Sequence, residues 1–414
     1  MFKKISQDNL IILKNLSFLS ILRFFNIGVK FLLVAYLVRV LGKINYGVLT
    51  WTDSIIQYFI IFINFGFNVY AAKYIVEKRN SKEALNKITS TVFTIKAWIF
   101  LFSFLLLFLL TFLDTFSSYK DFLFLMLLMG IGEVFFPIWY FQGIEKLKLA
   151  TYITVFSRVV LVVGTFLFVK NPEDIDKHIY LIVLSSFLMG ALGLLVLIKK
   201  YNFSLIWVGL DYILKTIKEA YMFFLGRFLS LTFNFMTIFL IGIFYTMDYV
   251  SGFDVALKIV LVCIIPFDML QQAVFPTITR NKNKALIKKL IFLSVGFGII
   301  LSTILYFFSA ELLQLFGGKE MIEFSDVLKN LAIIPPFVAL TFMLGTCTLV
   351  AFGFNKEFNQ SLIISSIFYI FIVLILYFTN TLTFWNLVYL RILSDIILAL
   401  IRVYFVLKMR LFKI

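Results

Sequence analysis

Histidine and cysteine are too scarce in this sequence to support much of the chemistry that depends on them. The chain of 414 residues contains one histidine, His178, and two cysteines, Cys263 and Cys347. Both cysteines fall among apolar neighbours, so neither a disulfide framework nor a metal site is expected. Charged residues make up only 14% of the chain, against about 25% in soluble domains, and hydrophobic residues make up 62%. A soluble protein is therefore excluded, and no cofactor is expected.

Apolar runs long enough to cross a bilayer recur along the whole chain. A helix needs about 20 apolar residues to span the hydrocarbon, and turn and charge signals separate twelve such runs. The predicted spans cover residues 17–38, 46–71, 88–112, 121–141, 150–169, 179–198, 220–244, 250–276, 290–309, 331–353, 360–379 and 384–407. The expected fold is an all-α polytopic membrane protein. No small-residue cleavage pattern precedes the first span, so we expect that span to be retained.

Lysine and arginine are distributed unevenly between the two sides of these spans. With a cytoplasmic N-terminus, the inner segments carry 23 basic residues and the outer loops carry 7. The positive-inside rule then places both termini in the cytoplasm. The net charge of +16 is explained by this topology and by attraction to anionic lipids, so nucleic-acid binding is not required.

Eight cations remain inside the predicted spans, where each costs roughly 2.5–3.5 kcal/mol at the centre of a helix that faces lipid. They are Arg23, Lys30, Lys96, Arg158, Arg227, Lys258, Arg391 and Arg402. Fewer acids accompany them in the spans or at their margins, namely Asp53, Glu133, Asp254, Asp268 and Asp395. Lys96, Arg158 and Arg402 lie near span ends, where snorkelling to the interface is an alternative to function. The other five cations are candidates for a polar interior.

Polar residues in three spans fall on single helical faces, because each residue advances the helix by about 100°. The stripes consist of Arg23, Asn26 and Lys30 in the first span, Asp53, Gln57, Asn64 and Asn68 in the second, and Arg391, Asp395 and Arg402 in the last. These spacings predict helices that turn polar faces toward a common interior. The alternative is interhelical hydrogen bonding that only holds the bundle together.

The spacing of the first stripe is repeated half a chain later. Arg227, Ser230 and Asn234 follow the pattern of Arg23, Asn26 and Lys30 at an offset of 204 residues. The repeat predicts two pseudo-symmetric lobes of six helices around a central cavity, residues 1–198 and 220–414, joined by a cytoplasmic linker at 199–219. Two such lobes suit an alternating-access transporter. A basic seam between them would attract an anion, and arginine suits phosphate well.

Three prolines, Pro137, Pro266 and Pro276, fall in or near the ends of predicted spans. A proline removes a backbone hydrogen bond from a helix, so these positions are candidate bending points or packing features.

Two stretches resemble a known family. "GKINYGVLTWTDSIIQYFIIFINFGFNVYAAKYI" (42–75) and "IWYFQGIEKLKLATYITVFSR" (138–158) are similar to signature regions of Wzx-type O-antigen flippases, in the polysaccharide-exporter branch of the multidrug/oligosaccharidyl-lipid/polysaccharide superfamily. The resemblance implies a bacterial inner-membrane protein that moves an oligosaccharide on undecaprenyl pyrophosphate from the cytoplasmic to the periplasmic leaflet. It also implies a V-shaped cavity with a cationic lining.

The leading hypothesis is therefore a flippase without enzymatic activity. Its expected partners are the lipid-linked oligosaccharide, membrane lipids and the polysaccharide polymerase machinery. The cations expected to bind pyrophosphate are Arg23, Lys30, Arg227, Lys258 and Arg391. The residues expected to face the sugars are Asn26, Gln57, Asn64, Asn68, Ser230 and Asn234. Coupling to H⁺ or Na⁺ would use Asp53, Glu133, Asp268 or Asp395, because burial and neighbouring charges can shift the pKa of a carboxyl group into a useful range.

Two alternatives stay open at this point. The first is a membrane polymerase or glycosyltransferase of the same pathway, for which Asp174 and Asp176 in "NPEDIDKH" (171–178) form an acid pair that could bind a metal. A solvated loop explains the same pair more simply. The second is a multidrug antiporter of the same superfamily. An antiporter for cationic drugs predicts an acidic cavity, whereas the charge excess in these spans is basic.

Overall fold

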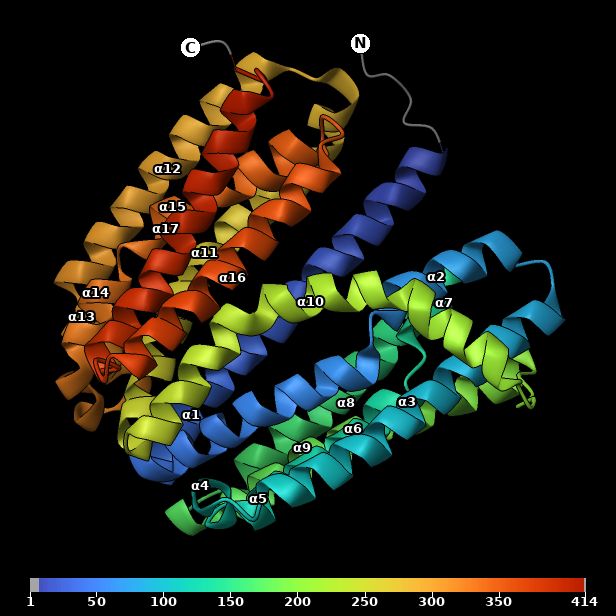
Figure 1. Ribbon diagram of the computed structural model, residues 1–414, viewed down its shortest axis with the longest axis horizontal. Coiled ribbons are helices and arrows are strands. Elements are labelled where there is room, and N and C mark those ends of the chain that lie inside the picture. Colours follow the sequence, from blue (N-terminus) through green and yellow to red (C-terminus); the bar gives the residue numbers. More distant parts are fainter. Residues whose placement is uncertain (1–6, 413–414) are drawn as a thin grey trace. The chain divides into compact units, whose positions relative to one another are not determined.

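The computed structural model describes the backbone of residues 7–412 and the side chains of residues 31–229 and 235–412. Within these residues every regular element is a helix (Figure 1). The chain folds into two compact units. The first contains the described part of residues 1–33 together with Phe59–Phe224, and the second contains Val34–Tyr58 together with the described part of residues 225–414.

Helix α1 (Gln7–Asn64) contributes to both units. Its helical path is interrupted at Gly42, whose φ of 73° and ψ of 168° are accessible to glycine but strained for other residues. The segment Val34–Tyr58 surrounds this kink and belongs to the second unit, while the chain before and after it belongs to the first. We call this segment the α1 tip.

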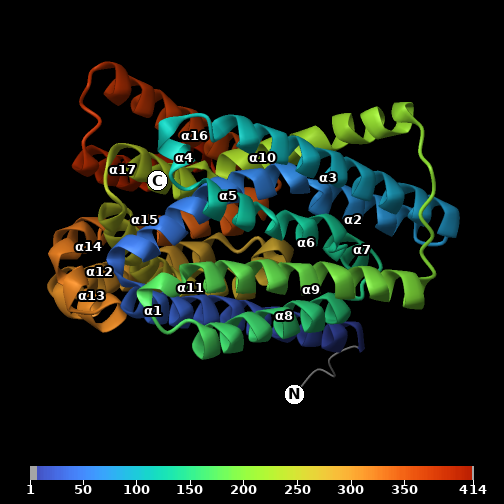
Figure 2. The same ribbon diagram turned by 90° about the horizontal axis from the view of Figure 1, so that it is seen from below.

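Eight α-helices lie wholly in the first unit. After α1 come α2 (Phe67–Lys78), α3 (Lys82–Leu110), α4 (Asp114–Ser117), α5 (Lys120–Leu127), α6 (Met129–Phe135), α7 (Ile138–Gly143), α8 (Leu147–Phe168), the 3₁₀ turn η1 (Pro172–Asp174) and α9 (Ile175–Tyr201). Helix α9 packs lengthwise against α8, as Figure 2 shows, and also against α6. Large apolar side chains, including Phe67, Trp139 and Phe141, form the buried core.

The second unit is built mainly from the C-terminal half. Its elements are the later part of α10 (Leu210–Phe244), α11 (Met247–Asn281), α12 (Lys284–Phe307), α13 (Ser309–Gly317), the 3₁₀ helix η2 (Lys319–Phe324), α14 (Ser325–Leu331), α15 (Ile334–Leu344), the π-helical η3 (Gly345–Val350), α16 (Asn355–Phe378) and α17 (Phe384–Lys408). Helix α15 packs against α11, α12 and α17 and so forms the centre of this unit.

The prediction of an all-helical membrane protein is confirmed. By length and composition, eight helical segments among the described residues could cross a membrane, or nine if the bent pair Lys319–Leu331 and Ile334–Val350 is one span. The count of twelve, the pseudo-symmetry and the central cavity stay predictions. The expected linker 199–219 holds the end of α9, a non-helical stretch and the start of α10. Of the three prolines, Pro137 separates α6 from α7, whereas α11 continues through Pro266 and Pro276.

Candidate functional site

Tyr46, Asp254 and Lys258 form a cluster inside the second unit. Tyr46 comes from the α1 tip, and the other two lie one turn apart on α11. The Tyr46 hydroxyl donates to Asp254 Oδ2 at 2.6 Å, while Lys258 Nζ donates to the same oxygen at 2.6 Å and to Tyr46 Oη at 2.8 Å. Tyr46 and Asp254 are only 2% and 3% exposed. The cluster therefore neutralises a buried carboxylate and joins the α1 tip to α11.

Two glycines allow the α1 tip to approach its neighbours this closely. A Cβ at Gly47 would lie 1.9 Å from the carbonyl oxygen of Met247, at the start of α11. A Cβ at Gly242 in α10 would lie 2.0 Å from the ring of Trp51. Trp51 is fully buried and donates from Nε1 to the Phe239 carbonyl at 3.1 Å. Backbone and ring contact therefore set the position of the tip within the second unit.

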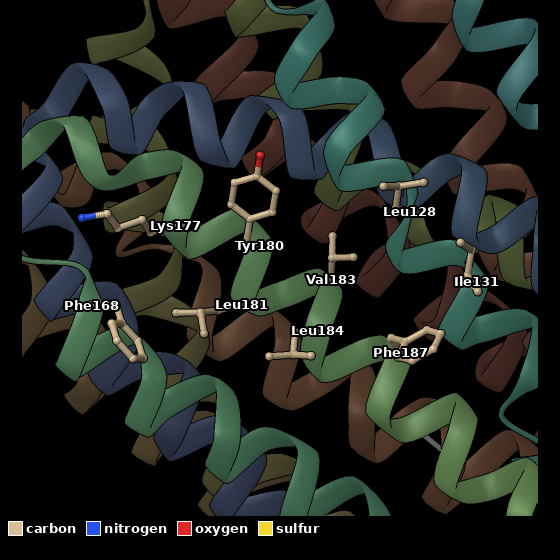
Figure 3. Close-up of a pocket in the computed structure, with 9 residues that line it drawn as sticks. All are labelled: Leu128, Ile131, Phe168, Lys177, Tyr180, Leu181, Val183, Leu184 and Phe187. Carbon is tan, nitrogen blue, oxygen red and sulfur yellow. The ribbon is translucent and has the colours of Figure 1, made fainter.

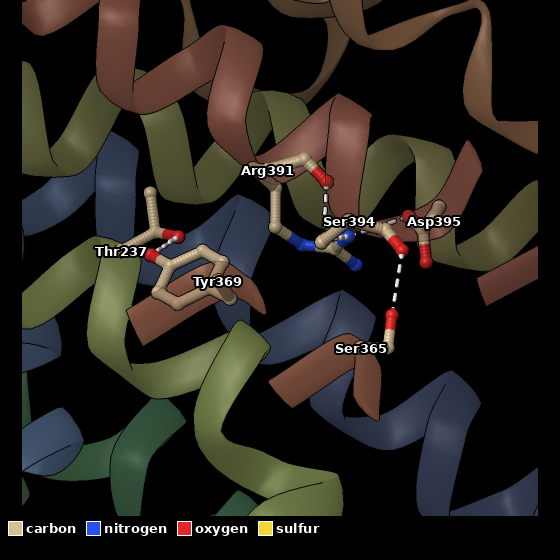
Figure 4. A network of polar contacts seen from close by, with 6 residues as sticks. All are labelled: Thr237, Ser365, Tyr369, Arg391, Ser394 and Asp395. Atoms are coloured by element: carbon tan, nitrogen blue, oxygen red, sulfur yellow. Dashed lines mark hydrogen bonds and ion pairs between the residues drawn. The ribbon is translucent and has the colours of Figure 1, made fainter. Parts of the chain in front are cut away.

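A second cluster in the same unit contains Arg391 and Asp395 of α17 (Figure 4). Their ion pair measures 2.5 Å, and Arg391 also donates to Ser394 Oγ at 3.3 Å. Ser365 of α16 donates to the Ser394 carbonyl at 3.3 Å, which ties α16 to α17. The predicted shared face of Arg391 and Asp395 is thus present as an ion pair between a buried arginine and a partly buried aspartate. Arg391 and Lys258 each have a carboxylate partner within their own unit. In both pairs the acid offsets the positive charge of the basic side chain.

Arg402 is buried rather than directed to a membrane interface. It is 4% exposed, donates from Nε to Ser361 Oγ at 3.2 Å and from a terminal nitrogen to the Thr341 carbonyl at 2.7 Å. Its guanidinium carbon lies 4.6 Å from the centre of the Phe358 ring. The snorkelling explanation is wrong for Arg402, because the side chain turns into the bundle at the junction of α15 and η3.

The polar cluster of the first unit consists of Asn64, Lys96 and Glu133. Lys96 is 1% exposed, so snorkelling is also wrong here, and its Nζ donates to the Glu133 backbone carbonyl at 2.6 Å. In an α-helix this carbonyl would accept from the residue four positions later, which is Pro137 and has no N–H. The lysine therefore replaces the donor that proline removes. The Glu133 carboxylate accepts from Asn64 Nδ2 at 3.1 Å.

The remaining predicted residues of the second stripe do not form one continuous face. Gln57 donates to Asp53 Oδ1 at 2.9 Å within the α1 tip. The chain then breaks at Phe65 and Gly66, both with positive φ, and Asn68 is an exposed residue of α2. The prediction that Asn68 shares a helical face with Asp53, Gln57 and Asn64 is wrong, because it assumed an unbroken helix over residues 46–71.

Other members of the predicted set are less informative. On α11, Asp268 accepts from Gln272 Nε2 at 2.8 Å and is partly buried. Arg227 is exposed on α10. Several predicted side chains lie outside the described ones, namely Arg23, Asn26, Lys30, Ser230 and Asn234.

The acid pair of the enzyme alternative has a structural explanation. Asp174 Oδ2 accepts the backbone N–H groups of Lys170 and Asn171, and Oδ1 pairs with Lys177 at 2.7 Å. Asp174 thus closes the turn before α9. Among the described residues, no group of three histidine, cysteine, aspartate or glutamate side chains could hold a metal.

Sequence reasoning missed the importance of Tyr46 and left Asp254 without a role. A signal was present for part of this cluster, because Asp254 and Lys258 are spaced i, i+4 and face each other on a helix. No pattern in the sequence indicates that a tyrosine 208 residues earlier completes the cluster.

A surface pocket in the first unit is apolar and separate from these clusters (Figure 3). It measures about 540 Å³ and lies along α9, where Tyr180, Leu184 and Phe187 line it together with the end of α8, Leu128 and α6. Its single charged lining residue, Lys177, is paired with Asp174. These features are those of a surface that faces lipid.

The sequence matches the model of a known protein family. The model of the family described as polysaccharide biosynthesis protein matches residues 12–282. The chain belongs to this family. The matched region includes both the Lys96 cluster and the Tyr46 cluster, whereas Arg391 and Asp395 lie beyond it.

Two bacterial relatives share most of their length with this family member. Both are named "Putative O-antigen transporter". The protein from Shigella dysenteriae is 24% identical over 86% of this chain and 90% of its own length. The protein from Escherichia coli K12 is 22% identical over 86% of this chain and 88% of its own length.

Solved structures of membrane transporters share the fold. The lipid II flippase MurJ, in an inward closed conformation, superposes with a TM-score of 0.78 at 16% identity and covers 94% of this chain and 87% of that one. An inward-facing multidrug resistance MATE transporter of the MOP superfamily gives 0.75 at 13% identity, with 94% of each chain covered. The polysaccharide biosynthesis family member therefore has the MOP transporter fold.

Proposed function

We propose that this protein is a flippase that moves undecaprenyl-pyrophosphate-linked oligosaccharide repeat units across the bacterial inner membrane by alternating access. The observation that carries the proposal is the sequence similarity, over 86% of this chain, to two proteins that are each named "Putative O-antigen transporter". The family membership and the transporter fold support the same function. In this proposal both termini are cytoplasmic, and the substrate moves from the cytoplasmic to the periplasmic leaflet.

Substrate recognition in the proposal has two chemical parts. The pyrophosphate would be bound by cations from the predicted set, and the sugars by the predicted amide and hydroxyl side chains. Lys258 and Arg391 contribute within polar clusters whose acids already offset their charge. Arg23 and Arg227, the residues related by the internal repeat, are therefore the first positions to test. The polysaccharide polymerase machinery would receive the exported product.

Ion coupling is proposed for four carboxyl groups. Glu133 is the most strongly supported of them, because its backbone carbonyl accepts a hydrogen bond from Lys96 and its carboxylate accepts one from Asn64. Asp53, Asp268 and Asp395 complete the set. The coupling ion would be H⁺ or Na⁺.

Reconstitution provides the direct test of the function. The purified protein is placed in proteoliposomes with a fluorescent lipid-linked oligosaccharide, and the fraction accessible to an added glycosidase or lectin is followed with time. We expect protein-dependent translocation that accelerates under an inward H⁺ or Na⁺ gradient. A rate equal to that of protein-free vesicles would refute the flippase, whereas equal rates with and without gradients would refute only the coupling.

A cellular test addresses the cations. We expect Arg23→Ala or Arg227→Ala to abolish surface polysaccharide while the protein still accumulates in the membrane, because the phosphate would lose its ligand but the fold would keep its core. Arg391→Ala is the contrasting variant, since it leaves the partly buried Asp395 without its ion pair, and it should lower protein accumulation as well. Normal export by the Arg23→Ala, Arg227→Ala double variant would reject the binding role.

The likeness to a MATE transporter supports drug antiport as a second candidate. The same proteoliposomes distinguish the two. Gradient-driven efflux of a cationic dye, without movement of the lipid-linked oligosaccharide, would replace the flippase by an antiporter.

A further inference from the structure

A small pocket lined by both polar and apolar side chains lies at one end of α12 in the second unit. It measures about 390 Å³, within the range of roughly 300–1,000 Å³ found for small-ligand sites. The last two turns of α12 line it with Ser302, Thr303, Tyr306 and Phe307, and α14 and the turn after it supply Lys329, Asn330, Ala332 and Ile333. The pocket therefore brings hydroxyl, amide, ammonium and aromatic groups to one place.

The position of the pocket along α12 places it at a membrane interface. Helix α12 has 24 apolar-rich residues and is about 36 Å long, slightly more than the roughly 30 Å of bilayer hydrocarbon. Its final turns consequently reach the level of the lipid headgroups. Tyr306 is 53% exposed there, as expected of a tyrosine in an interfacial aromatic belt, and the neighbouring Phe307 is 72% exposed.

The donors in this pocket suit a phosphate group. Ser302 Oγ is buried and has no hydrogen-bond partner among the described residues. Lys329 Nζ donates one hydrogen bond, to Asp326 Oδ1 at 2.9 Å, and carries two further N–H groups. Asn330 Nδ2 binds the Asp326 carbonyl at 2.7 Å and has a second N–H. A phosphodiester, which only accepts hydrogen bonds, would satisfy these donors.

The acid beside Lys329 determines which phospholipid fits. Asp326 has an exposed carboxylate, so the local charge of the pair is balanced. A headgroup with several negative charges, such as a pyrophosphate, would be repelled by this carboxylate. A zwitterionic headgroup places its phosphate near Lys329 and its ammonium near Asp326. We propose that this pocket binds the headgroup of phosphatidylethanolamine.

Native mass spectrometry of the purified protein tests this site. The probe is phosphatidylethanolamine, titrated in mixed micelles against an equal amount of phosphatidylglycerol. We expect the wild-type protein to retain phosphatidylethanolamine preferentially. Lys329→Ala and Ser302→Ala should raise the concentration for half occupancy by about tenfold and severalfold, respectively, because they remove one charged and one neutral donor.

Two further variants make the test specific. Lys319→Ala is the matched control, because Lys319 is an exposed lysine of η2 that does not line the pocket, and it should leave retention unchanged. Asp326→Asn should reverse the preference toward phosphatidylglycerol, since it removes the partner of the ammonium and keeps the partner of the phosphate. Asp326 is exposed, so this substitution should not impair folding.

Three results would overturn the proposal. They are equal retention of the two phospholipids by the wild-type protein, equal losses in Lys329→Ala and Lys319→Ala, and displacement of phosphatidylethanolamine by equimolar undecaprenyl pyrophosphate. The last result would assign the pocket to a polyprenyl phosphate. The site does not depend on the proposed flippase activity, because lipid retention is measured without transport.

Discussion

Removing the Tyr46 hydroxyl measures how strongly the buried cluster holds the α1 tip in the second unit. The hydroxyl joins a carboxylate and an ammonium at 2.6 and 2.8 Å, and each hydrogen bond to a charged group contributes about 1.5–3 kcal/mol. The two are not additive, because Asp254 and Lys258 still contact each other after the change. We therefore expect Tyr46→Phe to lower the free energy of unfolding by about 2–3 kcal/mol.

This loss is large enough to detect by thermal unfolding. For a domain of about 150–250 residues, 1 kcal/mol shifts the midpoint by roughly 2–4 °C, so Tyr46→Phe should lower it by about 5–10 °C. Tryptophan fluorescence can follow unfolding in detergent, because Trp51 packs in the same part of the unit. Tyr389→Phe is the matched control, since the Tyr389 ring is 49% exposed and stacks on Trp385.

A double-mutant cycle gives the refuting result. Lys258→Met leaves the buried Asp254 carboxylate without its ion pair and should cost about 3–5 kcal/mol. If the three groups act together, the effects of Tyr46→Phe and Lys258→Met will differ from their sum by about 1 kcal/mol or more. Equal midpoints for Tyr46→Phe and Tyr389→Phe, or strict additivity in the cycle, would show that the cluster does not hold the tip.

Two more substitutions test the other polar contacts by their effect on thermal unfolding. Lys96→Met should cost about 1–3 kcal/mol, because it leaves the Glu133 carbonyl without a hydrogen bond. Adding Pro137→Ala should recover part of this loss, because alanine restores a backbone N–H. No recovery would contradict the inference that Lys96 replaces the donor missing at Pro137. Gly345→Ala should cost about 1–3 kcal/mol, since its Cβ would lie 2.3 Å from the Arg402 guanidinium. Gly296→Ala should be neutral or stabilising, because none of the described side chains lies within 4 Å of its added Cβ. Equal effects at the two glycines would refute the close packing at Arg402.

The helices themselves were largely predictable from hydropathy. The expected spans 360–379 and 384–407 correspond to α16 and α17 within a few residues, because long apolar runs with polar ends leave little choice of boundary. The pairing of Arg391 with Asp395 was also accessible, since residues four apart lie on the same helical face. Local spacing therefore predicts contacts that one helix makes with itself.

Contacts between distant segments were not predictable in the same way. The apolar run 46–71 gave no warning of the break at Phe65–Gly66, which separates Asn64 from Asn68. Nothing around Lys96 indicated that its partner is a backbone carbonyl freed by Pro137, because that contact depends on the packing of α3 against α6. One sequence specifies where helices run more readily than which faces meet.

These polar contacts also change what the excess of basic residues means for transport. Lys258 and Arg391 have acid partners inside the second unit, and the Lys96 and Glu133 contact closes inside the first. A rocking motion that keeps each unit rigid would preserve the hydrogen bonds within all three clusters, so these contacts need not break in each transport cycle. The deformation would then be confined to the places where the chain passes between units, which are both ends of the α1 tip and the junction of Phe224 and Leu225 in α10. Gly226 lies next to that junction, and among the described side chains none lies within 4 Å of the position that a Cβ would take there.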